Sequence, residues 1–394
     1  MKPLLVMVPD HLSELVQKGE ITARYYNPGE LFDEVHLLMT NADRPDAAAL
    51  QKTVGRAALH LHNLPADKKT FARSLGFRPF LLESWAAPAV DLARRIRPAM
   101  IRCHGNYLNA FAASVIKRKL GIPYVVSLHI NRDEDMRGRA SSLKDRIYTN
   151  ATRDIERLSL RHADLVLPVY QPIVPYLQNM GVSHYEVAYN VLNPEHLRKK
   201  DDYALHDPVR VISVGRQFRE KNPENLIRAV ARIPGAHLTL VGDGEYHGRL
   251  VRAAQECGAP ERISFETAIP NDELCRSLPE YDIFATHTEF WEISKSVLEP
   301  LLTGLPVALN RRAGRPVPEL QGDHVMLVDN TVDAWRAAIE KLIADHAFRE
   351  KLGRTAYAHA QERWAPHKTE ARFADIYRRV MKQAGMERTE KGSA

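Results

Sequence analysis

The stretch from Tyr281 to Val307 constrains the fold of this chain more than any other. It starts with an apolar run of strand character, crosses a polar loop, enters a helical pattern at Ser296 and turns through Gly-Leu-Pro into a second apolar run. This order of strand, loop, helix and strand is the repeating unit of a doubly wound α/β sheet, in which ligands bind at the carboxyl ends of the strands. The stretch is therefore the first candidate for a binding site.

The length of 394 residues exceeds what one hydrophobic core normally serves, so we expect two domains. No apolar run approaches the roughly 18 residues of a membrane span, and we interpret Leu4 to Val8 as a buried strand and not as a signal peptide. Three cysteines that fall in different expected elements indicate neither a disulfide framework nor a four-ligand zinc site. These features predict a cytoplasmic protein. The net charge of +6 favours anionic partners, with peripheral contact to an anionic membrane left open.

Two histidines in the first half follow apolar runs that we expect to be neighbouring parallel strands. His104 follows Met100 to Cys103, and His129 follows Tyr124 to Leu128. Because parallel strands end at the same edge of a sheet, both histidines are expected in one crevice. The polar loop over residues 131 to 139 is expected to be a site loop. We assign no metal to its acidic residues, because such runs are usually solvated.

The polar, aperiodic segment Arg198 to Pro208 has the composition of a linker. We therefore expect an N-terminal domain over residues 1–200 and a C-terminal domain over 209–368. A final helix at 369–384 is expected to cross back to the N-terminal domain.

Two basic residues follow the first strand of the second half, Val209 to Val214. Arg216 and Lys221 stand five positions apart in a loop, and both could reach one diphosphate, Arg as a planar fork and Lys as a mobile point charge. The alternative is that they are two of the 55 basic residues on a solvated surface. The glycines of Gly242-Asp243-Gly244 lack the full spacing of a dinucleotide fingerprint, so no NAD site is predicted.

Two carboxylates, Glu292 and Glu299, flank the Ser294-Lys295-Ser296 tripeptide at the expected start of a helix. Backbone N–H groups at such a start can hold an anion. Ser296 and Glu299 also fit a capping box, in which Glu299 would bond back to the Ser296 amide and have no ligand. From the residues alone, Glu299 is either a ligand-binding residue or part of a capping box.

The second half resembles the donor domain of the retaining glycosyltransferases of family 4 (glycosyl transferases group 1), which have the two-domain GT-B fold. The first half is compatible through His104, His129 and the tract around Asn190. The matching words cover most of residues 209–382, in family order: VISVGRQFREKN, HLTLVGDGEYHGRL, ERISFETAIPNDEL, YDIFATHTEFWEISKSVLEPLLTGLPV and RWAPHKTEARFADIYRRVM.

The resemblance implies an α/β GT-B protein with two Rossmann-like doubly wound domains facing across a cleft. A nucleotide diphosphate sugar would bind there without a metal or other cofactor, and the N-terminal domain would hold the acceptor. Arg216 and Lys221 would neutralise the diphosphate, Glu299 would bind the ribose, and His129 would lie beside the transferring sugar. Further contacts to the donor are expected from Asn190 at the cleft, Thr267 near the base, and Gly19, Ser294, Lys295 and Ser296.

One departure from the family pattern lies in the opening stretch. The family's first glutamate stands eight positions before the second, and counting back from Glu299 gives Trp291. The nearest acid is Glu292, seven positions before Glu299, and Glu289 lies farther back. We expect Glu292 to contact the donor sugar, with Glu289 as the alternative. The family's Gly-Phe-Gly is replaced by Glu292-Ile293-Ser294.

The expected activity is that of a retaining hexosyltransferase acting on a glycan, lipid-linked or small-molecule acceptor. A nucleotide-sugar epimerase or a sugar phosphorylase on the same fold is the first alternative. A basic nucleic-acid-binding module is the second alternative, although no stacking or groove-reading motif is present, so nucleic acid is not the expected partner.

Overall fold

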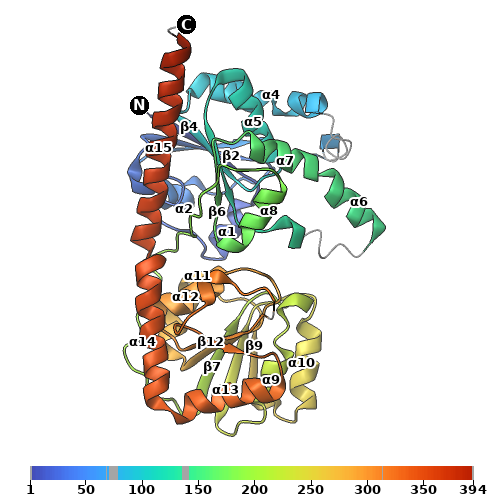
Figure 1. The fold of residues 1–394 in the computed structure, drawn as a ribbon, viewed down its shortest axis with the longest axis vertical. Helices are drawn as coiled ribbons and strands as arrows, with labels where there is room; N and C mark the ends of the chain where they lie inside the picture. The colour runs from blue at the N-terminus through green and yellow to red at the C-terminus, as the bar shows by residue number, and fades with distance from the viewer. Residues whose placement is uncertain (1, 68, 71–78, 135–141, 313, 393–394) are drawn as a thin grey trace. The chain divides into compact units, whose positions relative to one another are not determined.

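The computed structural model describes residues 2–67, 69–70, 79–134, 142–312 and 314–392 (Figure 1). By its contacts the chain divides into two compact units. The first comprises Met1–Gln17, Ile21–Val191 and His367–Ala394, and the second comprises Lys18–Glu20 and Leu192–Pro366. Within the described ranges, no helix combines the length and the apolar character that crossing a membrane requires.

The first unit is built on a six-stranded parallel sheet in the order β3-β2-β1-β4-β5-β6. Its central strands are continuous apolar runs because helices cover both faces of a parallel sheet; in β1, five of six residues are buried. The strands are β1 (Pro3–Val8), β2 (Glu34–Met39), β3 (Ala58–Asn63), β4 (Met100–His104), β5 (Tyr124–Leu128) and β6 (Leu165–Pro168).

The helices of the first unit form a layer on each face of this sheet (Figure 1). One layer consists of α1 (Leu12–Gln17), α2 (Ala47–Leu50) and α15 (Pro366–Gly392). The other contains α4 (Pro79–Ile96), α5 (Leu108–Leu120) and α7 (Arg153–Arg161), preceded by α6 (Leu143–Ala151), and α8 (Val174–Asn179) follows β6. The basic stretch after residue 143 is thus two helices. They part at Thr152, whose hydroxyl donates to the Thr149 carbonyl.

The second unit has its own six-stranded parallel sheet in the order β12-β11-β10-β7-β8-β9. Helices α9 (Glu224–Val230), α10 (His247–Glu256) and α13 (Val332–Ala344) pack on one face. Helices α11 (Asn271–Ser277) and α12 (Lys295–Thr303) lie on the other face, and α12 packs on α14 (His346–Arg363) (Figure 1). The strands are β7 (Val209–Val214), β8 (Ala236–Val241), β9 (Ile263–Glu266), β10 (Ile283–Thr286), β11 (Val307–Asn310) and β12 (Met326–Val328).

The two parallel sheets with helices on both faces confirm the predicted α/β fold class. Strands β3 and β12 were not predicted from the sequence. Both are edge strands with partly exposed side chains, so neither presents the continuous apolar run that marks the central strands. The segment before β7 packs on the second unit because the Lys200 amide donates to the Thr303 carbonyl and the Tyr203 hydroxyl to the Gly304 carbonyl.

Arg102 joins the last helix to the first unit's sheet. Its side chain, in β4, is 1% exposed, and its Nη1 donates to the Tyr25 carbonyl at 2.7 Å. The guanidinium carbon lies 5.1 Å from the ring centre of Tyr25, 4.8 Å from that of Phe373 and 5.8 Å from that of Tyr377. Since Phe373 and Tyr377 belong to α15, one cation holds this helix against β4 through cation–π contacts.

Replacing Arg102 by Ala is expected to lower the free energy of unfolding by about 2 kcal/mol, because the truncation leaves a cavity among three rings and a carbonyl without its donor. Urea unfolding followed by circular dichroism measures the change. The matched control is Arg94→Ala, whose side chain is 60% exposed in the same unit, and which is expected to change stability by less than about 0.5 kcal/mol. Equal midpoints for the two variants would contradict the role of Arg102.

Candidate active site

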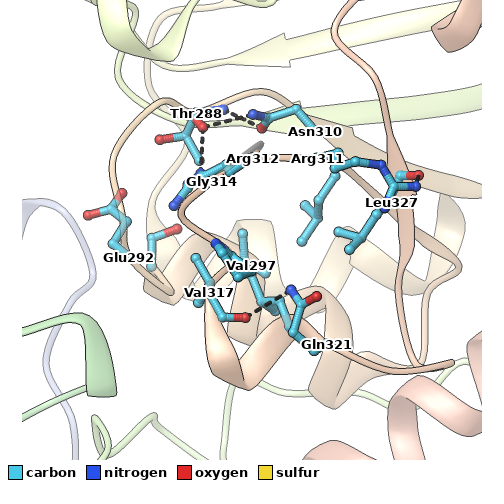
Figure 2. A pocket seen from close by; sticks show the side chains of 14 residues that line it. Thr288, Glu292, Val297, Asn310, Arg311, Arg312, Gly314, Val317, Gln321 and Leu327 are labelled. Carbon is cyan, nitrogen blue, oxygen red and sulfur yellow. Dashed lines mark hydrogen bonds between the residues drawn. The ribbon is translucent and has the colours of Figure 1, made fainter.

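Two adjacent pockets lie at the carboxyl ends of β7, β10 and β11 in the second unit. One, of about 20 Å³, is lined by the loop after β7 and the start of α12, including Arg216, Lys221 and His287. The other, of about 240 Å³, lies between the start of α12 and the loop after β11 (Figure 2). Thr288, Ser294 and Val297 line both pockets, so the pockets meet where α12 begins.

Helix α12 begins directly after Ser294, which is its N-cap residue and makes no capping bond with its side chain. The Ser294 hydroxyl oxygen instead lies 2.9 Å from the hydroxyl oxygen of Ser296. Because Ser294 and not Ser296 is the N-cap, the third helical residue is Val297, and Glu299 lies outside the capping-box position. The capping-box reading of Glu299 is therefore wrong. The helix start, with its N–H groups and positive dipole end, faces the pockets.

The two predicted cations border this helix start. Lys221 ends the 3-10 helix η5 (Arg219–Lys221), and its Nζ lies 2.6 Å from Oε1 of Glu292, with both side chains less than one-fifth exposed. Arg216 is exposed and stacks its guanidinium 4.8 Å from the ring centre of Phe218. Two positive groups thus line the small pocket, and the Glu292 carboxylate is the counter-charge of Lys221.

Close backbone packing holds the loop that carries these cations. Gly242, with φ of +131°, lies so near Gly215 that an added Cβ would clash with the Gly215 carbonyl oxygen. Gly244 approaches the Gln217 carbonyl in the same way. Gly242 and Gly244 therefore allow two loops to come into backbone contact. This close packing is a structural reason for their spacing, which resembles part of a dinucleotide fingerprint.

Trp291 and Glu292 point to different partners. This explains how Glu292 can serve as the acid although the family pattern places a glutamate at position 291. The Trp291 indole donates to the Pro316 carbonyl at 2.9 Å, and Arg315 lies over its ring. Glu292, the next residue, lines the larger pocket and pairs with Lys221. Glu289 is exposed and is joined to Glu220 through its backbone amide. The geometry thus favours Glu292 over Glu289 as the acid at the pocket.

Glu299 is a buried carboxyl one turn into α12 and 4% exposed. The Asn271 side-chain amide donates to its Oε1 at 2.9 Å, and the Cys275 thiol is a second partner. Burial raises the pKa of Glu299 to about 7, although the Asn271 hydrogen bond and the Lys295 charge oppose the rise. The carboxyl is therefore poised between its neutral and charged forms near neutral pH.

Gly19 and Lys295 lie close to the Glu299 carboxyl, whereas Thr267 lies away from it. Lys295 Nζ is 3.8 Å from a carboxylate oxygen of Glu20, the residue after Gly19. Gly19, with φ of +66°, packs on the start of α11, where the Asn271 amide donates to the Lys18 carbonyl. Thr267 follows β9, is exposed and lines neither of the two pockets.

The predicted residues of the first unit form a second group. His104, the last residue of β4, and His129, directly after β5, stack with ring centres 5.7 Å apart, as the common strand edge predicted. The segment after α8 runs beside β6 and delivers Asn190, whose Oδ1 lies 3.1 Å from His129 Nδ1. Of the loop expected over residues 131–139, the structure describes only 131–134; the remainder lies outside the described residues.

Several pocket residues had not been predicted from the sequence. His287 is 4% exposed, and burial together with the charge of Arg312 lowers its pKa to about 4, so it is neutral. Asn310 and Thr288 exchange two hydrogen bonds of 2.8 and 3.0 Å, and Arg312 Nε donates to the Thr288 carbonyl (Figure 2). Their place in the sequence was the signal that could have found them, because they lie at or directly after the carboxyl ends of β10 and β11.

Comparison with protein families matches both halves of the chain. Residues 197–359 match the model described as Glycosyl transferases group 1, and residues 28–191 match the Glycosyl transferase 4-like domain. The lipopolysaccharide core biosynthesis glycosyltransferase LpsE of Rhizobium meliloti is 33% identical over 39% of this chain and 45% of its own. A GDP-mannose-dependent alpha-(1-6)-phosphatidylinositol monomannoside mannosyltransferase of Mycolicibacterium smegmatis is 31% identical over 48% of this chain and 53% of its own. The chain thus spans about half the length of these curated relatives.

Solved structures match the fold over nearly the whole chain. Sucrose-phosphate synthase from Thermosynechococcus elongatus superposes with a TM-score of 0.73 at 16% identity, covering 97% of this chain and 100% of its own. HepE of Anabaena, solved with UDP, gives a TM-score of 0.72 at 18% identity, covering 95% and 99%. These neighbours, at 16% and 18% identity, show the shared fold. The two family models together match most of the chain, and they assign its second half to the glycosyl transferases group 1 family and its first half to the glycosyl transferase 4-like domain family.

Proposed function

We propose that this protein is a retaining glycosyltransferase that moves a sugar from a nucleotide diphosphate sugar to an acceptor. The observation that carries the proposal is the convergence of Arg216, Lys221 and the start of α12 on one pocket, with Glu292 beside them. A diphosphate needs this combination of a planar fork, a point charge and helix N–H groups. The named activities of the relatives, which include GDP-mannose-dependent transfer, and the UDP-glucose complex of HepE support the choice of donor class.

The chemistry that these residues can perform is stabilisation of a leaving group. When the bond between the sugar and the diphosphate breaks, negative charge grows on the diphosphate oxygens. Lys221 and Arg216 would neutralise that charge, and the helix start would donate N–H groups to it, so the step needs no metal. The ion pair with Glu292 holds the Lys221 ammonium in place before the donor arrives. Glu292 would in turn accept hydrogen bonds from hydroxyls of the sugar.

Glu299 is proposed to bind the ribose of the donor. Its second carboxyl oxygen can accept a hydroxyl hydrogen bond while Asn271 holds Oε1. Hydrogen bonding to the charged form favours ionisation, so ribose binding should shift this carboxyl from its poised state toward the carboxylate.

The first unit is proposed to contribute to the acceptor side through His129 and Asn190. Because the Asn190 oxygen can only accept, His129 Nδ1 carries the proton in their 3.1 Å contact. His129 Nε2 is then an acceptor, which suits contact with a sugar hydroxyl. The acceptor itself is proposed to be a glycan, a lipid-linked sugar or a small molecule.

A thermal-shift screen of nucleotide diphosphates and their sugars tests the donor. A donor at 100 times its Kd should stabilise the protein by about 2.7 kcal/mol through mass action, and failure of all of them to raise the Tm would contradict the proposal. Incubating the donor found, with and without acceptors, then tests the reaction. A transferase releases nucleotide diphosphate only when an acceptor is present, whereas an epimerase converts the donor alone.

A further inference from the structure

A cluster of metal-ligating side chains lies away from the pockets, on one face of the first unit's sheet. It is formed by Glu34 and His36 of β2 with His60 of β3, and each of the three offers a ligand atom within 4.8 Å of the others. His36 and His60 are direct partners in the strand register, with stacked rings 4.5 Å apart. Glu34 shares their face because side chains two apart in a strand point the same way.

His36 carries an independent sign of a ligand. The residue is only 6% exposed, and its Nε2 atom is buried without a hydrogen-bond partner. The nearest counter-group is the Glu34 carboxylate, whose Oε2 lies 3.5 Å away, beyond a good hydrogen bond. A buried ring nitrogen is costly to leave without a hydrogen bond, and the Glu34 carboxylate at 3.5 Å satisfies this one only weakly.

The other nitrogen of His36 is held in the manner of a metal ligand. Its Nδ1 lies 3.0 Å from Nε2 of His62, the next outward-facing residue of β3. Metal-bound histidines characteristically donate their second N–H to an acceptor, which fixes the tautomer and leaves a lone pair for the ion. The Nδ1 contact with His62 leaves the buried Nε2 of His36, the nitrogen beside Glu34, as the atom that would bind an ion.

We propose that Glu34, His36 and His60 form a binding site for a divalent transition-metal ion of the Zn²⁺ class. Two imidazoles and one carboxylate are a ligand set that such ions prefer, with water completing the tetrahedron. Ligand atoms of a tetrahedral zinc lie about 3.3 Å apart, so the exposed His60 ring closes the remaining distance by rotation. Because β3 is an edge strand, the ion would fasten the edge of the sheet to β2.

The test uses the full chain stripped with a chelator and reloaded with ZnSO₄. About one tightly held zinc per chain is expected after desalting, measured by mass spectrometry, together with a rise in Tm of several degrees. Loading with Co²⁺ should give visible d–d absorption of tetrahedral character. His60→Gln changes an exposed side chain and leaves the fold intact, yet it should weaken zinc binding by at least about tenfold.

The matched control is His346→Gln, another exposed histidine, with 59% of its side chain exposed, and its zinc affinity should equal that of the wild type. Glu34→Gln extends the test to the acid ligand and should also weaken binding at least about tenfold. Retention of wild-type zinc affinity by both Glu34→Gln and His60→Gln would overturn the site, since it would mean adventitious binding elsewhere among the 17 histidines. None of these measurements depends on glycosyl transfer.

Discussion

Replacing Lys221 by Gln is expected to lower kcat by about 10²- to 10³-fold, the cost of losing one preorganised group that stabilises charge in the transition state. The ammonium lies at the small pocket, 15% exposed and paired with Glu292, so its charge acts where little water screens it. Steady-state kinetics with the donor found by the thermal-shift screen would measure the loss. The pattern should be a fall in kcat larger than any rise in KM, because the charge on the diphosphate grows as the sugar leaves.

The matched control for this variant is Arg219→Gln, in the same 3-10 turn. Arg219 is exposed and lines neither pocket, so its loss should change kcat by less than about threefold. Equal losses of kcat for Lys221→Gln and Arg219→Gln would mean that only the general positive charge of the loop matters, and would contradict a specific role of Lys221.

A second comparison separates Lys221 from its partner Glu292. In a Glu292→Gln background, Lys221→Gln should still weaken binding of the nucleotide diphosphate, because the proposal gives Lys221 its own contact with the donor. If Lys221→Gln had no effect in that background, Lys221 would act only by orienting Glu292, and the diphosphate contact would be wrong.

Glu299→Gln is expected to change stability in a manner that depends on pH. The buried carboxyl has a pKa near 7 in the folded protein, against an ordinary value of 4.5. Between these values the folded chain holds a proton that the unfolded chain has lost, so this group's contribution to stability is full below about pH 4.5 and is lost as the pH rises through 7. The loss amounts to about 3 kcal/mol, and an uncharged Gln does not suffer it.

The stability of Glu299→Gln relative to the wild type should therefore rise by up to about 3 kcal/mol from acid to about pH 8. Thermal midpoints at about pH 5.5 and pH 8 capture about 2 kcal/mol of this change. Glu289→Gln, an exposed acid of the preceding loop, serves as the control. A relative stability that does not change with pH would show that this carboxyl ionises normally.

The same variant tests the ribose contact separately from folding. Donor affinity measured by calorimetry at pH 7, where both proteins are folded, should fall by about tenfold or more, the scale of one hydrogen bond to a charged group. Unchanged affinity would remove the functional role of Glu299 and leave its burial as a packing feature.

Local pattern was sufficient for much of the architecture and for part of the site. Central strands of a parallel sheet are covered on both faces, so β1 and β5 are readable as buried apolar runs, and β7 as an apolar run interrupted by the exposed Arg210. Edge strands are covered less, so β3 and β12 carry no such run and were missed. The cluster of Glu34, His36 and His60 was missed for the same reason. It forms only through the register between β2 and the edge strand β3, which the apolar pattern of the sequence does not reveal.

The sequence by itself determined the repeating strand and helix order, the family resemblance, and the position of Arg216, Lys221 and the two glutamates near strand ends. These properties depend on residue type and spacing along the chain. Only the tertiary structure decided that Ser294 caps α12, that Trp291 turns to Pro316 while Glu292 turns to Lys221, and that Glu299 is buried against Asn271. The physical reason is that the direction of a side chain in a loop and the pKa of a carboxyl are set by groups distant in sequence.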